Sequence, residues 1–192
     1  MNGFSAAGGW FRAFTMVILL AITTGGAAGA ERQVPLVFAG GHELGRNDYG
    51  RPCALMAAAL GVTTEQFRQA FSGVRPARGR GPTEEERRKN KDALMSVLAP
   101  LGVSNERMDE VANFYRFRPE NGEMWPNREA KGYAIVDGGK VKRVVVSDGG
   151  FGYNSTPVVR IGELPAVKLE AKLSFDKDMR KNGAVAEVLL VK

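Results

Sequence analysis

The chain changes its hydrophobic pattern near residue 130. Before this point, apolar residues recur at intervals of three and four, which is typical of helices that bury one face. Beyond it, apolar and polar residues alternate, most clearly in the unbroken run from Val167 to Phe175, which is typical of half-buried strands. The pattern predicts an α+β protein with a helical domain over 31–118, a linker over 119–130 and an antiparallel β domain over 131–192.

The helical domain is predicted to be small and to contain four helices arranged as two helical hairpins. Three of the helices follow a hydroxyl-bearing N-cap residue, and two of these are completed by the Gln or Glu of a capping box. The N-caps are Thr63, Thr83 and Ser104, and the expected helices span about 52–60, 64–72, 84–101 and 105–116.

The β domain is predicted to be an antiparallel sheet of four or five strands. Its first two strands surround the Gly-rich turn Asp137-Gly138-Gly139, which is typical of a hairpin. The expected strands are 133–136, 141–146, 157–161, 167–175 and 184–191.

Residues 138–161 carry a recognisable pattern within this domain. A G-x-V strand leads to Gly149-Gly150-Phe151-Gly152-Tyr153 and then to the P-x-V-x-I strand 157–161. The pattern GGxGYxxxPxVxI resembles a β repeat of bacterial surface proteins and phage tail fibres. The resemblance implies a structural or adhesive β module outside the cell. The helical part is similar to uncharacterised secreted bacterial proteins, which implies no particular activity.

The first thirty residues have the features of a secretory signal peptide. Arg12 is their only charged residue, and the apolar run 13–22 is about half as long as a membrane-spanning helix requires. The small residues Ala28-Gly29-Ala30 then form an A-x-A cleavage pattern. We expect cleavage near Ala30, a secreted or periplasmic location, and no transmembrane segment after cleavage.

Composition narrows the class of protein further. With 44% hydrophobic and 25% charged residues, the chain is neither a disordered tail, a collagen-like fibre nor a polytopic membrane protein. One cysteine excludes an internal disulfide framework, and one histidine excludes any site that needs two. We therefore expect no cofactor and no metal site.

One polar cluster lies within twelve positions at residues 42–53. An enzyme could use its histidine, carboxylates or thiol, so a small secreted hydrolase or thiol-dependent enzyme is the alternative function. The spacing fits neither a zinc protease nor a calcium loop, and a salt-bridged loop that docks the first helix is the other interpretation. Cys53 lies among apolar residues and is expected to be buried. The cluster consists of His42, Glu43, Asp48, Arg51 and Cys53.

Aromatic residues alternate with arginines over 114–118, and Trp125 follows in the linker. This pattern allows partner docking, or hydrophobic cover at the junction of helices and sheet. We expect Trp125 to be buried at that junction.

A basic loop provides the strongest candidate for ligand binding. Arg75, Arg78 and Arg80 stand among Gly and Pro residues, and planar guanidinium groups bind phosphate, sulfate or carboxylate in a bidentate manner. Alternatively, the loop is a solvated connector balanced by the three glutamates 84–86. With a net charge of +6 and predicted export, we expect a secreted non-enzymatic binding or structural module of the bacterial cell envelope. Its expected partners are envelope polyanions or another envelope protein, and not nucleic acid.

Overall fold

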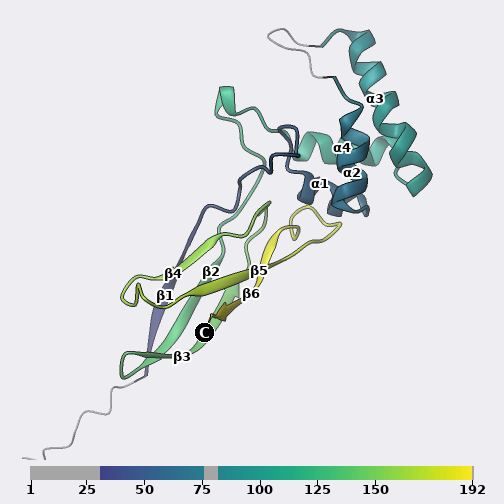
Figure 1. Ribbon diagram of the computed structural model, residues 1–192. Helices are drawn as coiled ribbons and strands as arrows, with labels where there is room; N and C mark the ends of the chain where they lie inside the picture. Colours follow the sequence, from purple (N-terminus) through teal and green to yellow (C-terminus); the bar gives the residue numbers. More distant parts are fainter. Residues whose placement is uncertain (1–30, 76–81, 192) are drawn as a thin grey trace, which may run out of the picture.

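The computed structural model describes residues 31–75 and 82–191 and has an α+β fold (Figure 1). A curled antiparallel sheet has the strand order β3-β2-β1-β4, and a separate hairpin pairs β5 with β6. Four helices gather at one end of the strands (Figure 1). The strands are β1 (Arg32–Ala39), β2 (Lys131–Asp137), β3 (Lys140–Asp148), β4 (Val158–Ile161), β5 (Leu169–Ser174) and β6 (Ala184–Leu190). The helices are α1 (Cys53–Leu60), α2 (Thr64–Ser72), α3 (Glu84–Leu98) and α4 (Asn105–Phe114), with short 3-10 turns at Ala99–Leu101 and Pro119–Asn121.

Strand β1 corrects the prediction that 31–118 is a helical domain without strands. Its first half pairs with β2 and its second half with β4, so it joins the sheet before the chain enters the helices. Val34, Leu36 and Phe38 alternate inward as a half-buried strand requires. Pro35, which interrupts the strand pattern in the sequence, is tolerated because each half of β1 has only one paired edge.

The predicted β domain is divided into two sheets. The expected strand 167–175 is shorter, and it pairs with β6 alone. Two successive turns cause the separation, in which Leu164 donates to the carbonyl of Ile161 and Val167 to that of Leu164, both at 3.0 Å. The β5–β6 hairpin then lies over the inner face of the four-stranded sheet, where both contribute to one apolar core.

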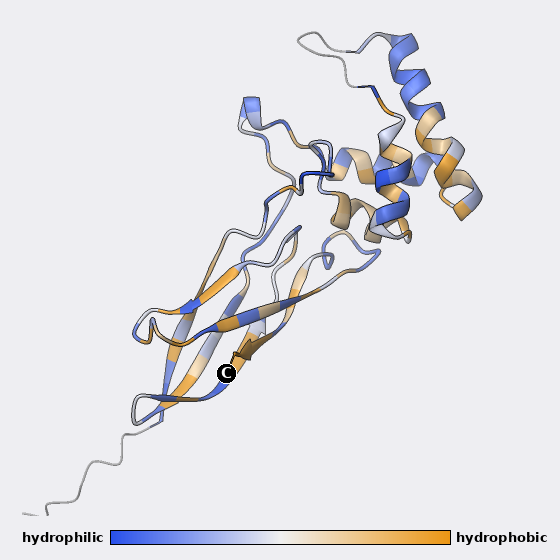
Figure 2. Cartoon of the chain, in the orientation of Figure 1, coloured by the Kyte–Doolittle hydropathy of each residue, from blue (hydrophilic) through white to orange (hydrophobic). Residues whose placement is uncertain are grey.

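The helices begin where the sequence predicts. Thr63 and Thr83 both form capping boxes, and Ser104 accepts a hydrogen bond from the backbone of Arg107. Helix α1 has no polar face and is buried. The first half of α3 is hydrophilic and its second half is apolar, as Figure 2 shows, so only the second half packs onto the helical core. Among residues 31–75 and 82–191, no helix is long and apolar enough to span a membrane.

The segment with the GGxGY pattern connects β3 to β4. Gly150 and Gly152 have φ values of 62° and 91°, a left-handed conformation that a side chain would strain. The ring of Tyr153 is buried beside them, and its hydroxyl accepts a hydrogen bond of 2.9 Å from the backbone of Ala130.

Trp125 is buried at the junction of helices and strands, as predicted. It is 1% exposed, and its indole N–H donates a hydrogen bond of 2.8 Å to the carbonyl of Gly152. The indole therefore ties the connection after α4 to the loop between β3 and β4.

Candidate functional site

The polar cluster at residues 42–53 divides into separate environments in the structure. Asp48 is 2% exposed and pairs with Arg68 of α2, whose Nε and Nη2 lie 2.9 and 2.8 Å from its Oδ1. The other carboxylate oxygen accepts a hydrogen bond of 2.7 Å from the backbone of Gly45. Both oxygens are thus used to hold the loop before α1 against α2, and this carboxylate has a structural role.

Cys53 is buried, as predicted, and has no access to solvent. Its Sγ lies 3.4 Å from the carbonyl oxygen of Asp48. Burial, reinforced by the negative charge of Asp48, raises the pKa of the thiol to about 12. Because the thiolate is the reactive form, Cys53 is inert at neutral pH.

His42 lies away from Cys53, between two aromatic rings at the junction. Its ring centroid is 5.2 Å from that of Tyr153 and 6.2 Å from that of Trp125. Its Nε2 is buried and has no hydrogen-bond partner among the described residues. No hydroxyl or thiol of the described residues therefore forms a hydrogen bond with this nitrogen.

Glu43 is fixed by the loop that follows β3. Its carboxylate accepts hydrogen bonds from the hydroxyl of Ser155 and from the backbone of Gly41, at 2.9 Å for the latter. The Ser155 hydroxyl is the main reason that the pKa of Glu43 lies below its ordinary range. This carboxylate therefore fastens the end of β1 to the start of β4.

Arg51 is the member of the cluster that remains available. Its guanidinium is half-buried and lies 6.0 Å from the ring centroid of Phe71 in α2. No described residue forms an ion pair or a side-chain hydrogen bond with it. Burial, followed by the positive charges of Arg118 and Arg116, lowers the pKa of this guanidinium. The structure therefore holds Arg51 in an electrostatically unfavourable position.

We call Arg51, Arg116 and Arg118 the arginine cluster. Arg116 and Arg118 follow the end of α4, and their only described polar partners are Asn113 at 2.9 Å and Glu123 at 4.0 Å, respectively. Arg51 is thus close enough to Arg116 and Arg118 to be repelled by them, and the one described carboxylate paired within the cluster is that of Glu123 with Arg118. Guanidinium groups in this state favour binding of an anion that can accept several hydrogen bonds.

A strained aromatic residue lies beside this cluster. Tyr49 is 57% exposed, and its ring centroid lies 6.3 Å from that of Phe71, the ring that also faces Arg51. Its φ of 49° is the only positive value of a non-glycine residue in the described part of the chain. Such strain concentrates at binding and catalytic sites.

The basic loop predicted from sequence is described only at its first arginine. Arg75 is exposed, and its backbone N–H and carbonyl both bond the side chain of Asn90, at 2.9 Å each. Arg78 and Arg80 lie outside the described residues. These two hydrogen bonds attach the first residue of the loop, which follows α2, to the side of α3.

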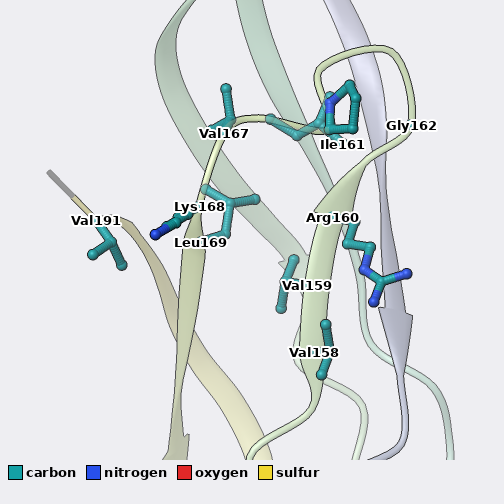
Figure 3. Close-up of a pocket in the computed structure, with 10 residues that line it drawn as sticks. Val158, Val159, Arg160, Ile161, Gly162, Val167, Lys168, Leu169 and Val191 are labelled. Carbon is teal, nitrogen blue, oxygen red and sulfur yellow. The ribbon is translucent and has the colours of Figure 1, made fainter.

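A separate apolar groove of about 640 Å³ lies between β4 and β5. Figure 3 shows Val159 and Leu169 between the two strands, whereas Arg160 and Lys168 project away from the gap. A ligand site usually combines an apolar lining with a few convergent polar side chains, which this groove lacks. Within the described residues, no group of three or more His, Cys, Asp or Glu is placed to hold a metal ion.

Sequence reasoning found the parts of the arginine cluster but did not join them. Arg51 belonged to the polar cluster, whereas Arg116 and Arg118 belonged to the run of alternating aromatic residues and arginines. They meet because α4 packs against α1, where Arg107 donates hydrogen bonds of 3.3 and 2.9 Å to the carbonyl of Ala59.

Comparisons with protein-family models, with curated proteins and with solved structures found no match, so the functional argument rests on these residues.

Proposed function

We propose that this protein is a non-enzymatic binding module of the cell envelope that holds an anionic ligand at the arginine cluster. The unpaired, half-buried guanidinium of Arg51 is the observation that carries the proposal. Arg116 and Arg118 add charge of the same sign, so a bound carboxylate, sulfate or phosphate would relieve their repulsion and supply hydrogen-bond acceptors.

The alternative, a hydrolase or thiol-dependent enzyme at residues 42–53, has little support in this geometry. The thiol of Cys53 is buried and protonated, and the carboxylate of Asp48 is bonded on both oxygens. His42 packs between aromatic rings rather than beside a nucleophile. A binding role needs none of these groups to be reactive.

The envelope setting is inferred from the sequence. Residues 1–30 have the pattern of a secretory signal, and residues 138–161 resemble a β repeat of bacterial surface proteins and phage tail fibres. Acidic glycans and lipid headgroups are the abundant anions outside the cytoplasm, whereas nucleic acid is not. Envelope polyanions are therefore the ligand class that we propose.

Retention on a heparin matrix tests the proposal, because heparin presents closely spaced sulfates and carboxylates. We expect the parent protein to bind at low salt and to elute as the Debye length falls toward ~3 Å at 1 M salt. The triple variant Arg51→Gln, Arg116→Gln, Arg118→Gln should elute at a clearly lower salt concentration.

A matched control removes three positive charges from separated exposed positions. The variant Arg88→Gln, Lys168→Gln, Arg180→Gln should keep most of the parent's retention, because no cluster is broken. Equal losses in the two variants would show that net charge alone determines binding. No retention of the parent protein would contradict anion binding and leave a structural module.

The basic loop remains the second candidate for the same function. Changing Arg75, Arg78 and Arg80 together to Ser removes its charge while leaving the bonds between the Arg75 backbone and Asn90 available. If this variant loses retention and the cluster variant does not, the ligand binds at the loop. If neither loses it, Lys140, Lys142 and Arg143 are the next positions to change.

A further inference from the structure

The outer face of the four-stranded sheet carries apolar side chains that belong to neither of the two apolar cores. Successive strand residues point to opposite faces, and the inward set packs under the β5–β6 hairpin. The outward set is usually polar in an antiparallel sheet that faces water. Here it includes Pro35, Val37, Tyr133, Ile135, Val145 and Val158.

These residues form a continuous band and not isolated exposures. Strand pairing places Tyr133 directly between Pro35 on β1 and Val145 on β3. Val37 and Val158 extend the band toward β4 and are 53% and 52% exposed. Contiguous apolar surface of this kind marks an interaction site.

Two arginines flank the band on the same face. Arg143 of β3 pairs across the strands with Ile135, and Arg160 of β4 pairs with Val37. Neither guanidinium forms an ion pair or hydrogen bond with a described residue. Asp137 has the same orientation on β2, but it is paired with Lys142 at 3.2 Å. The face therefore presents apolar side chains and unpaired positive charge.

We propose that this face docks an amphipathic helix of a partner protein, with acidic residues beside the apolar stripe of that helix. The β5–β6 hairpin already covers the inner face of the sheet, so a helix on the outer face would add a third layer. At the level of Tyr133, the three paired strands β1, β2 and β3 span about 10 Å, which matches the diameter of a helix, about 10–12 Å. Acidic side chains on both sides of the stripe can then reach Arg143 and Arg160.

Charge opposes a second copy of this chain as the occupant. Two such faces in contact would place apolar bands together, but they would also enclose four unpaired arginines with no acid to neutralise them. Buried like charges of this kind are costly. A partner that brings carboxylates satisfies both the apolar and the charged part of the face.

The test uses a designed helical peptide of 18 residues as the probe. Leucines at i, i+3, i+4 and i+7 form its stripe, glutamates flank them, and a matched peptide carries lysine in place of glutamate. We expect fluorescence anisotropy to show binding of the glutamate peptide and at least tenfold weaker binding of the lysine peptide. The variants Val37→Ser with Val158→Ser, and Arg143→Gln with Arg160→Gln, should each weaken binding at least tenfold.

A control changes exposed apolar residues on the other sheet. Leu189 and Leu190 on β6 are 38% and 44% exposed, so Leu189→Ser with Leu190→Ser removes comparable surface. This control should bind the glutamate peptide as the parent does. All four changed apolar side chains are partly exposed, so we expect each variant to keep the fold. Thermal unfolding of each variant checks this.

Several outcomes would overturn the proposal. One is that the parent protein fails to bind the glutamate peptide, or binds the glutamate and lysine peptides equally well. Another is that the variants of the sheet face and the control variant on β6 bind the glutamate peptide equally well. Sedimentation showing a dimer that Val37→Ser with Val158→Ser dissociates would assign the face to self-association. Binding to vesicles containing phosphatidylglycerol that the same variants abolish would assign it to lipid. The arginine-cluster variant should retain peptide binding, so failure of the proposed function remains distinguishable.

Discussion

The side-chain amide of Asn182 donates a hydrogen bond of 2.9 Å to the hydroxyl of Tyr115. Asn182 lies in the connection between β5 and β6, and Tyr115 ends α4. The same amide group donates to the carbonyl of Leu55 in α1 at 2.7 Å, and its oxygen accepts from the backbone of Asp176 at 3.2 Å. One buried polar side chain thus joins the β hairpin to two helices.

Replacing Asn182 by leucine should destabilise the protein by about 2–5 kcal/mol. The change removes the amide from the Leu55 carbonyl, from the Tyr115 hydroxyl and from the backbone N–H of Asp176, and each buried group left unsatisfied costs about 1–3 kcal/mol. Among the described residues, the Tyr115 hydroxyl keeps only its 3.5 Å hydrogen bond to the carbonyl of Met179. Urea unfolding of the parent and the variant measures the difference in free energy of unfolding.

The control is Tyr115→Phe, which removes the hydroxyl and leaves the amide its other two hydrogen bonds. It should cost about 1 kcal/mol, and the double variant should cost less than the sum of the two changes. A loss of less than about 0.5 kcal/mol in Asn182→Leu would mean that the junction rests on apolar packing.

The pair Asp48–Arg68 should contribute more to stability than an exposed ion pair, because the Asp48 side chain is only 4% exposed. Asp48→Ala is expected to cost about 1–3 kcal/mol, because the backbone N–H of Gly45 loses its acceptor, whereas Arg68 is 34% exposed and keeps Glu65 as a partner. The exposed pair Lys89–Glu85, broken by Glu85→Gln, should change stability by less than about 1 kcal/mol. Similar losses in the two variants, measured by thermal unfolding, would contradict the structural role of Asp48.

Local signals explain why the helices could be predicted. Thr63 and Thr83 each bond residues three positions later, so the capping boxes are encoded within four consecutive residues. The hairpin of β2 and β3 is similarly local, because its turn lies between the two strands. Neither depends on distant parts of the chain.

Strand β1 was missed because its partners lie about a hundred residues away. Val34 pairs with Ala134 and Phe38 pairs with Val159, and no residue near 32–39 indicates these pairings. Pro35 also lowers the strand propensity of the segment. The order of elements along the chain therefore did not reveal the order of strands in the sheet.

The candidate site depends on the same long-range packing. In the sequence, nothing distinguishes Arg51 and Arg116 from other arginines. Only the packing of α4 against α1 shows that they lie near each other without a carboxylate among the described residues to pair with them. Asn182 lies between the expected strands 167–175 and 184–191, and a buried polar role leaves no pattern in the neighbouring residues. Burial and pairing of polar groups are properties of the tertiary structure.

Acid should weaken the bond between Ser155 and Glu43. The folded pKa of Glu43 lies below its unfolded value, so its stabilising effect is present above about pH 4.5 and is lost as pH falls through the folded pKa. Ser155→Ala should lower stability at pH 7 by less than about 1 kcal/mol, because the pair is exposed, and should have a smaller effect near pH 2. Urea unfolding at both pH values measures this, and an equal loss at both would contradict it.

Alkaline pH should destabilise the fold through Cys53. The thiol has a folded pKa of about 12 against an ordinary value of 9.0, so its contribution is complete below pH 9 and is lost as pH rises toward 12. The slope approaches about 1.4 kcal/mol per pH unit while only the unfolded thiol ionises. Cys53→Ala should remove this slope between pH 9 and 10 and cost about 1–2 kcal/mol at neutral pH through the small cavity it leaves.

Thiol labelling provides an independent measurement of the same burial. At pH 8 the native protein should react with a disulfide reagent far more slowly than the urea-unfolded chain, because Cys53 has no solvent access and remains protonated. Burial also raises the pKa of Tyr115, to about 12, and that of Tyr153, so both add to the alkaline loss as pH approaches 10. The difference in slope between the parent and Cys53→Ala therefore isolates the contribution of the thiol. Rapid labelling of the native protein, or an unchanged alkaline slope in Cys53→Ala, would show that the loop before α1 opens and that the thiol is reactive.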